Sequence, residues 1–231
     1  RMCRETRRKN RGVWNMIPLE TIIPNKHRIR VVLDSFNEWL RGLDFTMPDR
    51  MYDRKRNDGG MYLVSSEKIV SELMGMVDKQ KYPGFLDVGC GKGFILWKAY
   101  QSGFKKIGGV EYDEKLTEIC NKNMKRLKLT DSMTVTCTDA REFENYGDYD
   151  VFYFFNPFKG DIMQTVIDKI CTQCAGREIM IMYYRPRYPE PIENTGFFNK
   201  IRTLYDEERH YDIAVYQGAI PAGYTVPEKK D

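Results

Sequence analysis

The 231-residue sequence lacks any apolar run long enough to cross a membrane. Its longest apolar stretches, "VFYFF" and "IMIMYY", have the length of buried strands, whereas a membrane-spanning helix needs roughly 20 apolar residues. No apolar segment follows the basic stretch "RMCRETRRKNR", so a secretory signal is not expected either. The sequence therefore predicts no contact with a membrane.

Cysteine and histidine are both scarce. The six cysteines, at positions 3, 90, 120, 137, 171 and 174, are too scattered for a disulfide framework and suit a protein of the reducing cytoplasm. Only Cys171 and Cys174 have C-x-x-C spacing, and they lie in a helical pattern without a second pair, so no metal site is expected. The two histidines, His27 and His210, lie outside the motifs described below, which leaves those motifs without the commonest general base.

The charge of the chain is nearly balanced, with a formal net charge of +4. Residues 1–11 hold six Lys or Arg and one Glu, a net of +5, so the rest of the chain carries 31 basic against 32 acidic residues. The basic excess belongs to this segment and not to the fold. It indicates either a solvated segment or one that makes weak contact with nucleic-acid phosphates.

Two regions differ in pattern, which predicts a division into residues 1–60 and 61–231. Residues 26–42 have apolar side chains at helical spacing and predict an amphipathic helix, which would cover the main domain or pair two copies in a homodimer. The polar stretch "MPDRMYDRKRNDGG" at 47–60 is typical of a loop or lid. From residue 61 onward, strands and helices alternate, as in a doubly wound α/β domain.

The predicted elements follow a regular order. Strands are expected at 84–88, 106–111, 133–136, 151–155 and 178–184, and helices at 67–77, 94–102, 114–127, near 141 and at 161–174. The last part, about 199–217, has two β-rich runs around a charged turn and predicts an antiparallel hairpin. A mostly parallel sheet that ends in such a hairpin is a more specific pattern than the general Rossmann-like fold.

The stretch "FLDVGCGKGF" at 85–94 predicts a strand, a glycine-rich loop and a helix start, the common arrangement of a nucleotide site. Gly89, Gly91 and Gly93 give G-x-G-x-G, whereas the dinucleotide fingerprint is G-x-G-x-x-G. Asp87 stands two residues before the first glycine, where its charge would repel a pyrophosphate. A phosphate-free ligand with an ammonium group, such as S-adenosylmethionine, suits this carboxylate better.

Three further motifs end the following strands. Glu111 closes the second strand, where a carboxylate can accept hydrogen bonds from both hydroxyls of a ribose. Asp139, in "TDA", could bind the amino group of an adenine or cap a short helix. Asn156 and Pro157, in "FFNPF", form either a turn or an acceptor site, in which the Asn oxygen takes hydrogen bonds from an amine.

Taken together, these motifs resemble those of the class I S-adenosylmethionine-dependent methyltransferases, in particular small stand-alone bacterial members, over about residues 61–231. The resemblance implies a Rossmann-like, seven-stranded sheet of order 3-2-1-4-5-7-6 with strand 7 antiparallel, and an N-terminal helical extension. It implies cofactor contacts from the following residues: Asp87, Gly89, Cys90, Gly91, Gly93, Glu111, Tyr112, Asp139, Ala140 and Asn156.

The resemblance also assigns the acceptor side of the site. Asn156, Pro157 and Phe158 fall where amine-methylating members have Asn/Asp-Pro-Pro-Tyr/Phe, although this chain has one proline fewer. Together with the scarcity of histidine, this favours methyl transfer to a nitrogen over transfer to an oxygen, unless Lys159, Tyr62 or Tyr183 supplies a base. A protein side chain, RNA and a small amine all remain open as acceptors.

Two alternatives to a methyltransferase remain at this point. One is a non-catalytic module that keeps the fold as a binding platform. The other is a NAD(P)-dependent oxidoreductase, against which the glycine spacing, Asp87 and the terminal hairpin all count.

Overall fold

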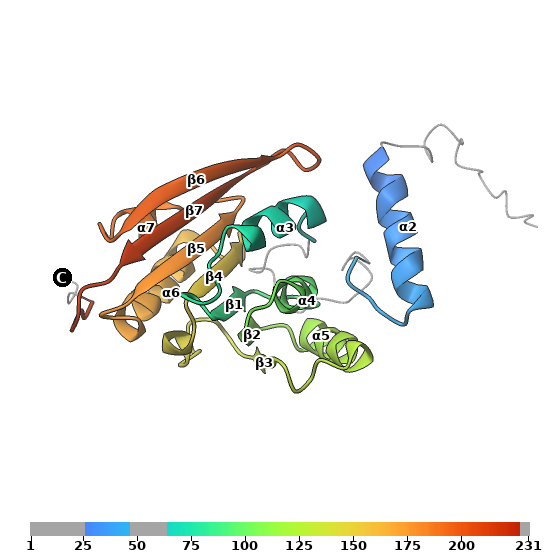
Figure 1. Cartoon of the computed structure of the whole chain (residues 1–231), viewed down its shortest axis with the longest axis horizontal. Coiled ribbons are helices and arrows are strands. Elements are labelled where there is room, and N and C mark those ends of the chain that lie inside the picture. Colours follow the sequence, from blue (N-terminus) through green and yellow to red (C-terminus); the bar gives the residue numbers. More distant parts are fainter. Residues whose placement is uncertain (1–25, 47–63, 227–231) are drawn as a thin grey trace, which may run out of the picture.

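A computed structural model describes residues 26–46 and 64–226 of the chain. Its centre is one seven-stranded sheet of order β3-β2-β1-β4-β5-β7-β6 (Figure 1). The strands from β3 to β5 pair in parallel, and β7 is antiparallel to both of its neighbours. The predicted fold class and strand order are confirmed.

The four central strands are short apolar runs covered on both faces. They are β1 (Gly84–Val88), β2 (Lys106–Glu111), β4 (Val151–Phe155) and β5 (Glu178–Tyr184). Every residue of β1 is buried, as expected for a parallel strand between two helical layers. The edge strands β3 (Thr134–Cys137) and β6 (Phe198–Asp206) carry more polar side chains, and β7 (Tyr211–Ala219) lies between β5 and β6.

Helices cover each face of the sheet and form two separate cores. One face packs against α3 (Glu67–Gly75), α4 (Phe94–Gln101) and α5 (Glu114–Leu127). The other packs against α6 (Gly160–Gln173), the 3-10 turn η2 (Tyr146–Asp148) and α7 (Glu190–Glu193). Alternate residues of each strand serve the two cores: Phe85 of β1 belongs to the first and Leu86 to the second.

The N-terminal extension contributes α2 (Lys26–Leu40) and the segment that follows it. In Figure 1, α2 lies beside α4 and α5 and not against the sheet. Leu43 and Phe45 are buried, and the Phe45 ring stacks on Trp97 of α4 at 5.5 Å between centroids. The apolar residues of α2 whose burial the structure describes are more than half exposed: Leu33, Phe36, Trp39 and Leu40. The described contacts with the main domain come chiefly from the segment after the helix, where the carbonyl oxygen of Arg41 accepts a hydrogen bond from Nε of Arg126 at 2.9 Å and Leu43 and Phe45 are buried.

Most predicted boundaries are confirmed to within two residues, and one element is wrong. The short helix expected near Arg141 is a turn, because the Asp139 carboxylate accepts hydrogen bonds from both the backbone and the guanidinium of Arg141 instead of capping a helix. None of the described helices is long and apolar enough to cross a membrane. The lid-like stretch 47–60 and the basic segment 1–11 lie outside the described residues.

Candidate functional site

The glycine-rich loop turns the chain sharply between β1 and α4. The backbone N–H groups of Gly89 and Cys90 both donate to the carbonyl oxygen of Val110 on β2, at 2.8 and 3.0 Å. Gly89 has a φ of +91°, and a Cβ added there would lie 2.8 Å from Cβ of Pro157. Only glycine fits this position, because the conformation is left-handed and the proline occupies the space of a side chain.

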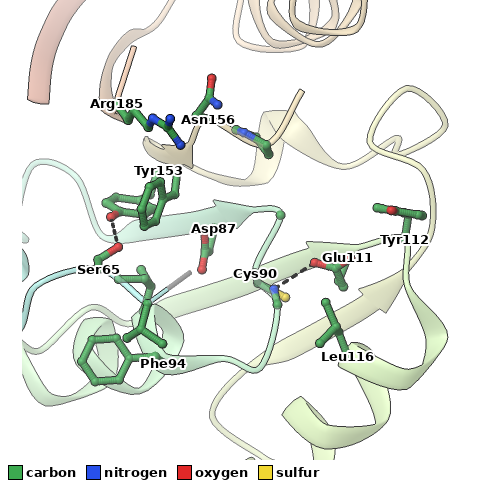
Figure 2. A pocket seen from close by; sticks show the side chains of 16 residues that line it. Ser65, Asp87, Cys90, Phe94, Glu111, Tyr112, Leu116, Tyr153, Asn156 and Arg185 are labelled. Atoms are coloured by element: carbon green, nitrogen blue, oxygen red, sulfur yellow. Dashed lines mark hydrogen bonds between the residues drawn. The ribbon is translucent and has the colours of Figure 1, made fainter. Parts of the chain in front are cut away.

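A cavity of about 160 Å³ opens at the carboxyl ends of the parallel strands, the edge where open α/β sheets bind ligands. Figure 2 shows side chains converging on it from β1, β2 and the residues after β4 and β5. The lining residues that the sequence predicted are Asp87, Gly89, Cys90, Gly91, Glu111, Tyr112, Asn156 and Pro157. Those that it missed include Val64, Ser65, Phe94, Tyr153, Phe155 and Arg185.

Asp87 and Glu111 make the deep side of this cavity acidic. Asp87 is 3% exposed, and no described residue donates a hydrogen bond to its carboxylate. Burial, followed by the nearby charge of Glu111, raises the pKa of Asp87 well above its usual range. A buried carboxylate without a donor is a site for a cationic group, which would relieve the cost of burying the charge.

Glu111 differs because the backbone already holds it. Its carboxylate accepts hydrogen bonds from the N–H groups of Gly91, at 2.9 Å, and Asp113, at 3.0 Å. Burial raises the pKa of Glu111, while backbone hydrogen bonds from Asp113, Gly91 and Tyr112 oppose the shift. A carboxylate has about four acceptor positions, so Glu111 can still accept a hydrogen bond from a ligand hydroxyl such as that of a ribose.

A smaller cavity of about 40 Å³ adjoins the larger one. Gly89, Tyr112 and Pro157 line both cavities, so the Gly89–Pro157 contact forms part of the wall between them. The smaller cavity also holds Thr138, Asp139, Ala140, Arg141, Phe158 and Ile162. The predicted adenine-side residues are thus brought together, and Phe158 lies with them and not with Asn156 in the larger cavity.

Asp139 is not an open acceptor in this arrangement. Its Oδ2 lies 2.7 Å from Nη2 of Arg141, and its Oδ1 accepts from the backbone N–H of Arg141 at 2.9 Å. A ligand amino group would therefore share the Asp139 carboxylate with Arg141.

Two residues that line the larger cavity have a backbone conformation that side chains rarely adopt. Four described non-glycine residues have positive φ: Lys128, Asn156, Arg185 and His210. Lys128 ends α5, and His210 ends the turn of the β6–β7 hairpin. Asn156 and Arg185 directly follow β4 and β5, and both line the cavity. Left-handed strain of this kind is concentrated at functional sites.

Asn156 also carries an unsatisfied polar atom. Its Oδ1 is buried and has no hydrogen-bond partner among residues 26–46 and 64–226. Such an atom costs about 1–3 kcal/mol unless something donates to it. The position of Asn156 beside the cavity therefore suits a ligand with an N–H or O–H group.

Two further predicted residues, Gly93 and Cys90, pack against Cys120 of α5. Gly93 precedes α4 with a φ of +85°, and a Cβ there would lie 2.5 Å from Sγ of Cys120. Hydrogen bonding to Cys120 and burial raise the pKa of the Cys90 thiol, which keeps it protonated. Among the described residues no group of three or more metal-ligating side chains occurs.

Lys92, inside the glycine loop, has a partner that the sequence pattern did not reveal. Its side chain is completely buried, and Nζ lies 2.6 Å from Oδ1 of Asp44 in the N-terminal extension. Asn123 of α5 bridges the same two residues, because its Nδ2 donates to the carbonyl oxygens of Asp44 and Lys92 at 2.8 and 3.0 Å. The extension therefore packs directly on the loop.

Comparison with known proteins identifies the central region of the chain. Residues 85–175, from β1 to just beyond α6, match the family model described as a methyltransferase domain. Among curated proteins, no sequence matches this chain.

Solved structures resemble the fold at low sequence identity. An RNA methyltransferase from Salinibacter ruber in complex with S-adenosyl-L-homocysteine is 20% identical with a TM-score of 0.50, over 73% of this chain and 99% of that one. A Streptococcus pneumoniae protein, Sp1610, assigned as a tRNA (m1A22) methyltransferase, is 14% identical with a TM-score of 0.52, over 71% and 74%. A StiE O-methyltransferase segment is 12% identical with a TM-score of 0.52, over 66% and 74%. At these identities the likeness establishes the shared fold.

Proposed function

Because the chain contains a methyltransferase domain of the class I, S-adenosylmethionine-dependent type, we propose that it transfers a methyl group to a nitrogen atom of its acceptor. The methyltransferase-domain match over residues 85–175 and the fold shared with solved methyltransferases support the predicted resemblance, the enzyme class and S-adenosylmethionine as cofactor. The choice of a nitrogen acceptor rests on one observation: Asn156 lines the cavity, and its buried Oδ1 has no described hydrogen-bond partner.

The two cavities support a division of the cofactor site. When bound, S-adenosylmethionine supplies a methyl group on a sulfonium, which is already activated for displacement. We assign the ammonium end to Asp87, whose buried carboxylate has no described donor, and the ribose to Glu111. We assign the adenine to the smaller cavity with Tyr112, Asp139, Ala140 and Phe158.

Asn156 would position the acceptor. Its side-chain oxygen can accept a hydrogen bond from the N–H of a neutral amine, which leaves the nitrogen lone pair free to attack. Pro157 has no N–H and a restricted φ, so it holds the loop rigid next to Gly89. The chain's contribution is then alignment and the exclusion of water, which can be worth several powers of ten in rate.

A neutral amine needs no base before it attacks. This fits the cavity, because His210, Lys159 and Tyr183 line neither part of it, while Tyr62 lies outside the described residues. An alcohol acceptor would need a base within hydrogen-bond reach. The carboxylates of Asp87 and Glu111 are assigned to the cofactor in this proposal, which leaves no other described carboxylate in the larger cavity for that task.

RNA is the acceptor class to test first. Two of the structural neighbours are described as acting on RNA, and the basic stretch 1–11 would suit phosphate contacts. The StiE segment is described as an O-methyltransferase, so the shared fold alone does not decide the acceptor atom.

The experiment supplies methyl-labelled cofactor and three separate acceptor fractions: RNA, protein and small metabolites. Label transfer with release of S-adenosylhomocysteine is expected, and mass spectrometry of the product locates the methyl group. A methyl group found on oxygen or carbon would overturn the nitrogen assignment. Binding of the cofactor without transfer to any fraction would favour the non-catalytic alternative.

Asn156→Ala tests the proposed role of the amide. Because one preorganised hydrogen bond is lost, kcat should fall about 100-fold or more, while affinity for S-adenosylhomocysteine stays within about three-fold. Asn156→Asp keeps an acceptor oxygen and should retain more activity. Asn145→Ala, at an exposed position outside both cavities, is the matched control. Equal kcat in Asn156→Ala and Asn145→Ala would remove Asn156 from the mechanism.

A further inference from the structure

Arg185 is a cationic side chain in the larger cavity that the proposed reaction does not use. It directly follows β5, has a φ of +55° and lines the cavity together with Asn156. No described carboxylate forms an ion pair with its guanidinium. A charged group at a cavity wall with no ionic partner is available for a ligand.

The neighbours of Arg185 hold it in place. The guanidinium carbon lies 4.4 Å from the centre of the Tyr211 ring, which is cation–π geometry. The backbone N–H of Arg185 donates to the carbonyl oxygen of Asp212 at 2.8 Å, so β7 fixes the strained residue. Tyr211 in turn meets Phe155 and Tyr184 edge-on, at 6.3 Å between ring centroids in both cases. A preorganised guanidinium loses little entropy when it binds an anion.

The position of Arg185 separates it from the cofactor's expected charged end. Asp87 is the penultimate residue of β1 and Arg185 follows β5, with β4 between the two strands. Neighbouring strands are about 4.8 Å apart, so these two positions are about 10 Å apart across the sheet. Figure 2 shows Arg185 and Asn156 on one side of the cavity, and Asp87 and Glu111 on the other. A methionine carboxylate is attached to the same carbon as the ammonium and so stays near Asp87.

We propose that Arg185 binds an anionic oxygen group, carboxylate or phosphate, of the methyl acceptor, next to the nitrogen held by Asn156. A planar guanidinium can bind either group through two parallel hydrogen bonds. The acceptor is then an amine that carries a negative charge close to the methylated nitrogen. The inference rests on the proposed function only in that an acceptor enters this cavity.

The first test uses the protein saturated with S-adenosylhomocysteine, in a buffer of low ionic strength. Inorganic phosphate and acetate are titrated separately, and binding is followed by the relaxation of the ³¹P and ¹H signals of the probes. At least one probe should bind to the unaltered chain, and Arg185→Gln should weaken its binding about ten-fold or more. The probe that binds better tells phosphate from carboxylate.

Two further variants make the test specific. Arg187→Gln removes an exposed charge that lines neither cavity, and it should leave probe binding unchanged. Arg185→Lys keeps the charge without the planar fork and should recover part of the binding. Probe binding that is equal in the unaltered chain and in Arg185→Gln would overturn the inference.

Calorimetry with S-adenosylhomocysteine tests whether the anion that Arg185 binds belongs to the acceptor or to the cofactor. Arg185→Gln should change its dissociation constant less than three-fold. A ten-fold loss of affinity would assign Arg185 to the cofactor's own carboxylate and overturn the inference. Neither measurement requires turnover, so a failure of this inference is distinguishable from a failure of the proposed methyl transfer.

Discussion

Asp87→Asn should make the empty protein more stable while weakening cofactor binding. The Asp87 carboxylate is 3% exposed and no described residue donates to it, so the folded protein bears the cost of burying a charge. The amide that replaces it is neutral but still polar, so we expect a net gain of about 1 kcal/mol out of the roughly 1–3 kcal/mol that an unsatisfied group costs. For a chain of this size, that raises Tm by about 2–4 °C.

The same substitution should weaken binding of S-adenosylhomocysteine, which keeps the ammonium group. A lost charge-assisted hydrogen bond is worth about 1.5–3 kcal/mol, which corresponds to roughly a 10- to 150-fold higher dissociation constant. Bound ligand adds stability in proportion to the logarithm of one plus the ratio of ligand concentration to dissociation constant, so the order of Tm values should reverse at high ligand concentration. Calorimetry and thermal unfolding, with and without ligand, measure both effects.

The pH dependence follows from the direction of the Asp87 shift. Because burial raises the pKa of Asp87 in the folded protein above its unfolded value of about 3.9, ionisation costs folding stability. The cost is absent below that unfolded value, grows as the pH rises toward the raised pKa, and is constant above it. The advantage of Asp87→Asn should therefore disappear below about pH 4.

A ligand without the amino-acid end provides the control. 5′-Methylthioadenosine should bind the unaltered chain and Asp87→Asn equally well, because it has no ammonium. Glu111→Gln should lose stability rather than gain it, because Glu111 accepts two backbone hydrogen bonds. A lower Tm for empty Asp87→Asn, or an unchanged affinity for S-adenosylhomocysteine, would refute the reasoning.

Two other substitutions test the glycine loop. Gly89→Ala should lower the free energy of unfolding, measured in urea, by about 1–3 kcal/mol more than Gly103→Ala does. Both glycines have positive φ, but of the two only Gly89 would bring its new Cβ against another atom, Cβ of Pro157 at 2.8 Å. Equal losses in the two variants would contradict the packing argument. Asp44→Ala should lower the free energy of unfolding by about 1–3 kcal/mol, less than the loss of a fully buried ion pair, because the Asp44 side chain is 30% exposed. The loss should be smaller when Lys92→Met is already present, because the ion pair is then already broken; additive losses would contradict the coupling of Asp44 to Lys92.

The central fold could be predicted from the sequence because its signals are local. β1, β2, β4 and β5 begin and end where predicted, since each is a short apolar run bounded by turn residues. The polar edge strand β3 begins and ends one residue later than predicted. The four-residue helix α7 was missed, because four residues are too few to show a helical period.

The site could be predicted only in part, because some of its residues are marked by local sequence patterns and others are not. Asp87 and Glu111 lie at the carboxyl ends of two neighbouring parallel strands, as the penultimate residue of β1 and the last residue of β2, so topology alone brings them to one cavity. Arg185 follows β5 in the same way, but a single arginine in "YYRPR" has no spacing that marks it. Its role depends on Tyr211, which lies 26 positions further along the chain on an antiparallel strand.

Lys92 shows why the loop sequence alone was ambiguous about its ligand. A lysine within "GCGKG" is where a phosphate-binding cation would be expected, and it would favour a nucleotide with a pyrophosphate. In the structure Lys92 lines neither cavity, and its buried ammonium lies against Asp44. The loop therefore keeps its cation away from the ligand and presents Asp87 instead. A cavity with carboxylates at its deep side would repel the pyrophosphate of NAD and attract the ammonium of S-adenosylmethionine, in agreement with the methyltransferase match.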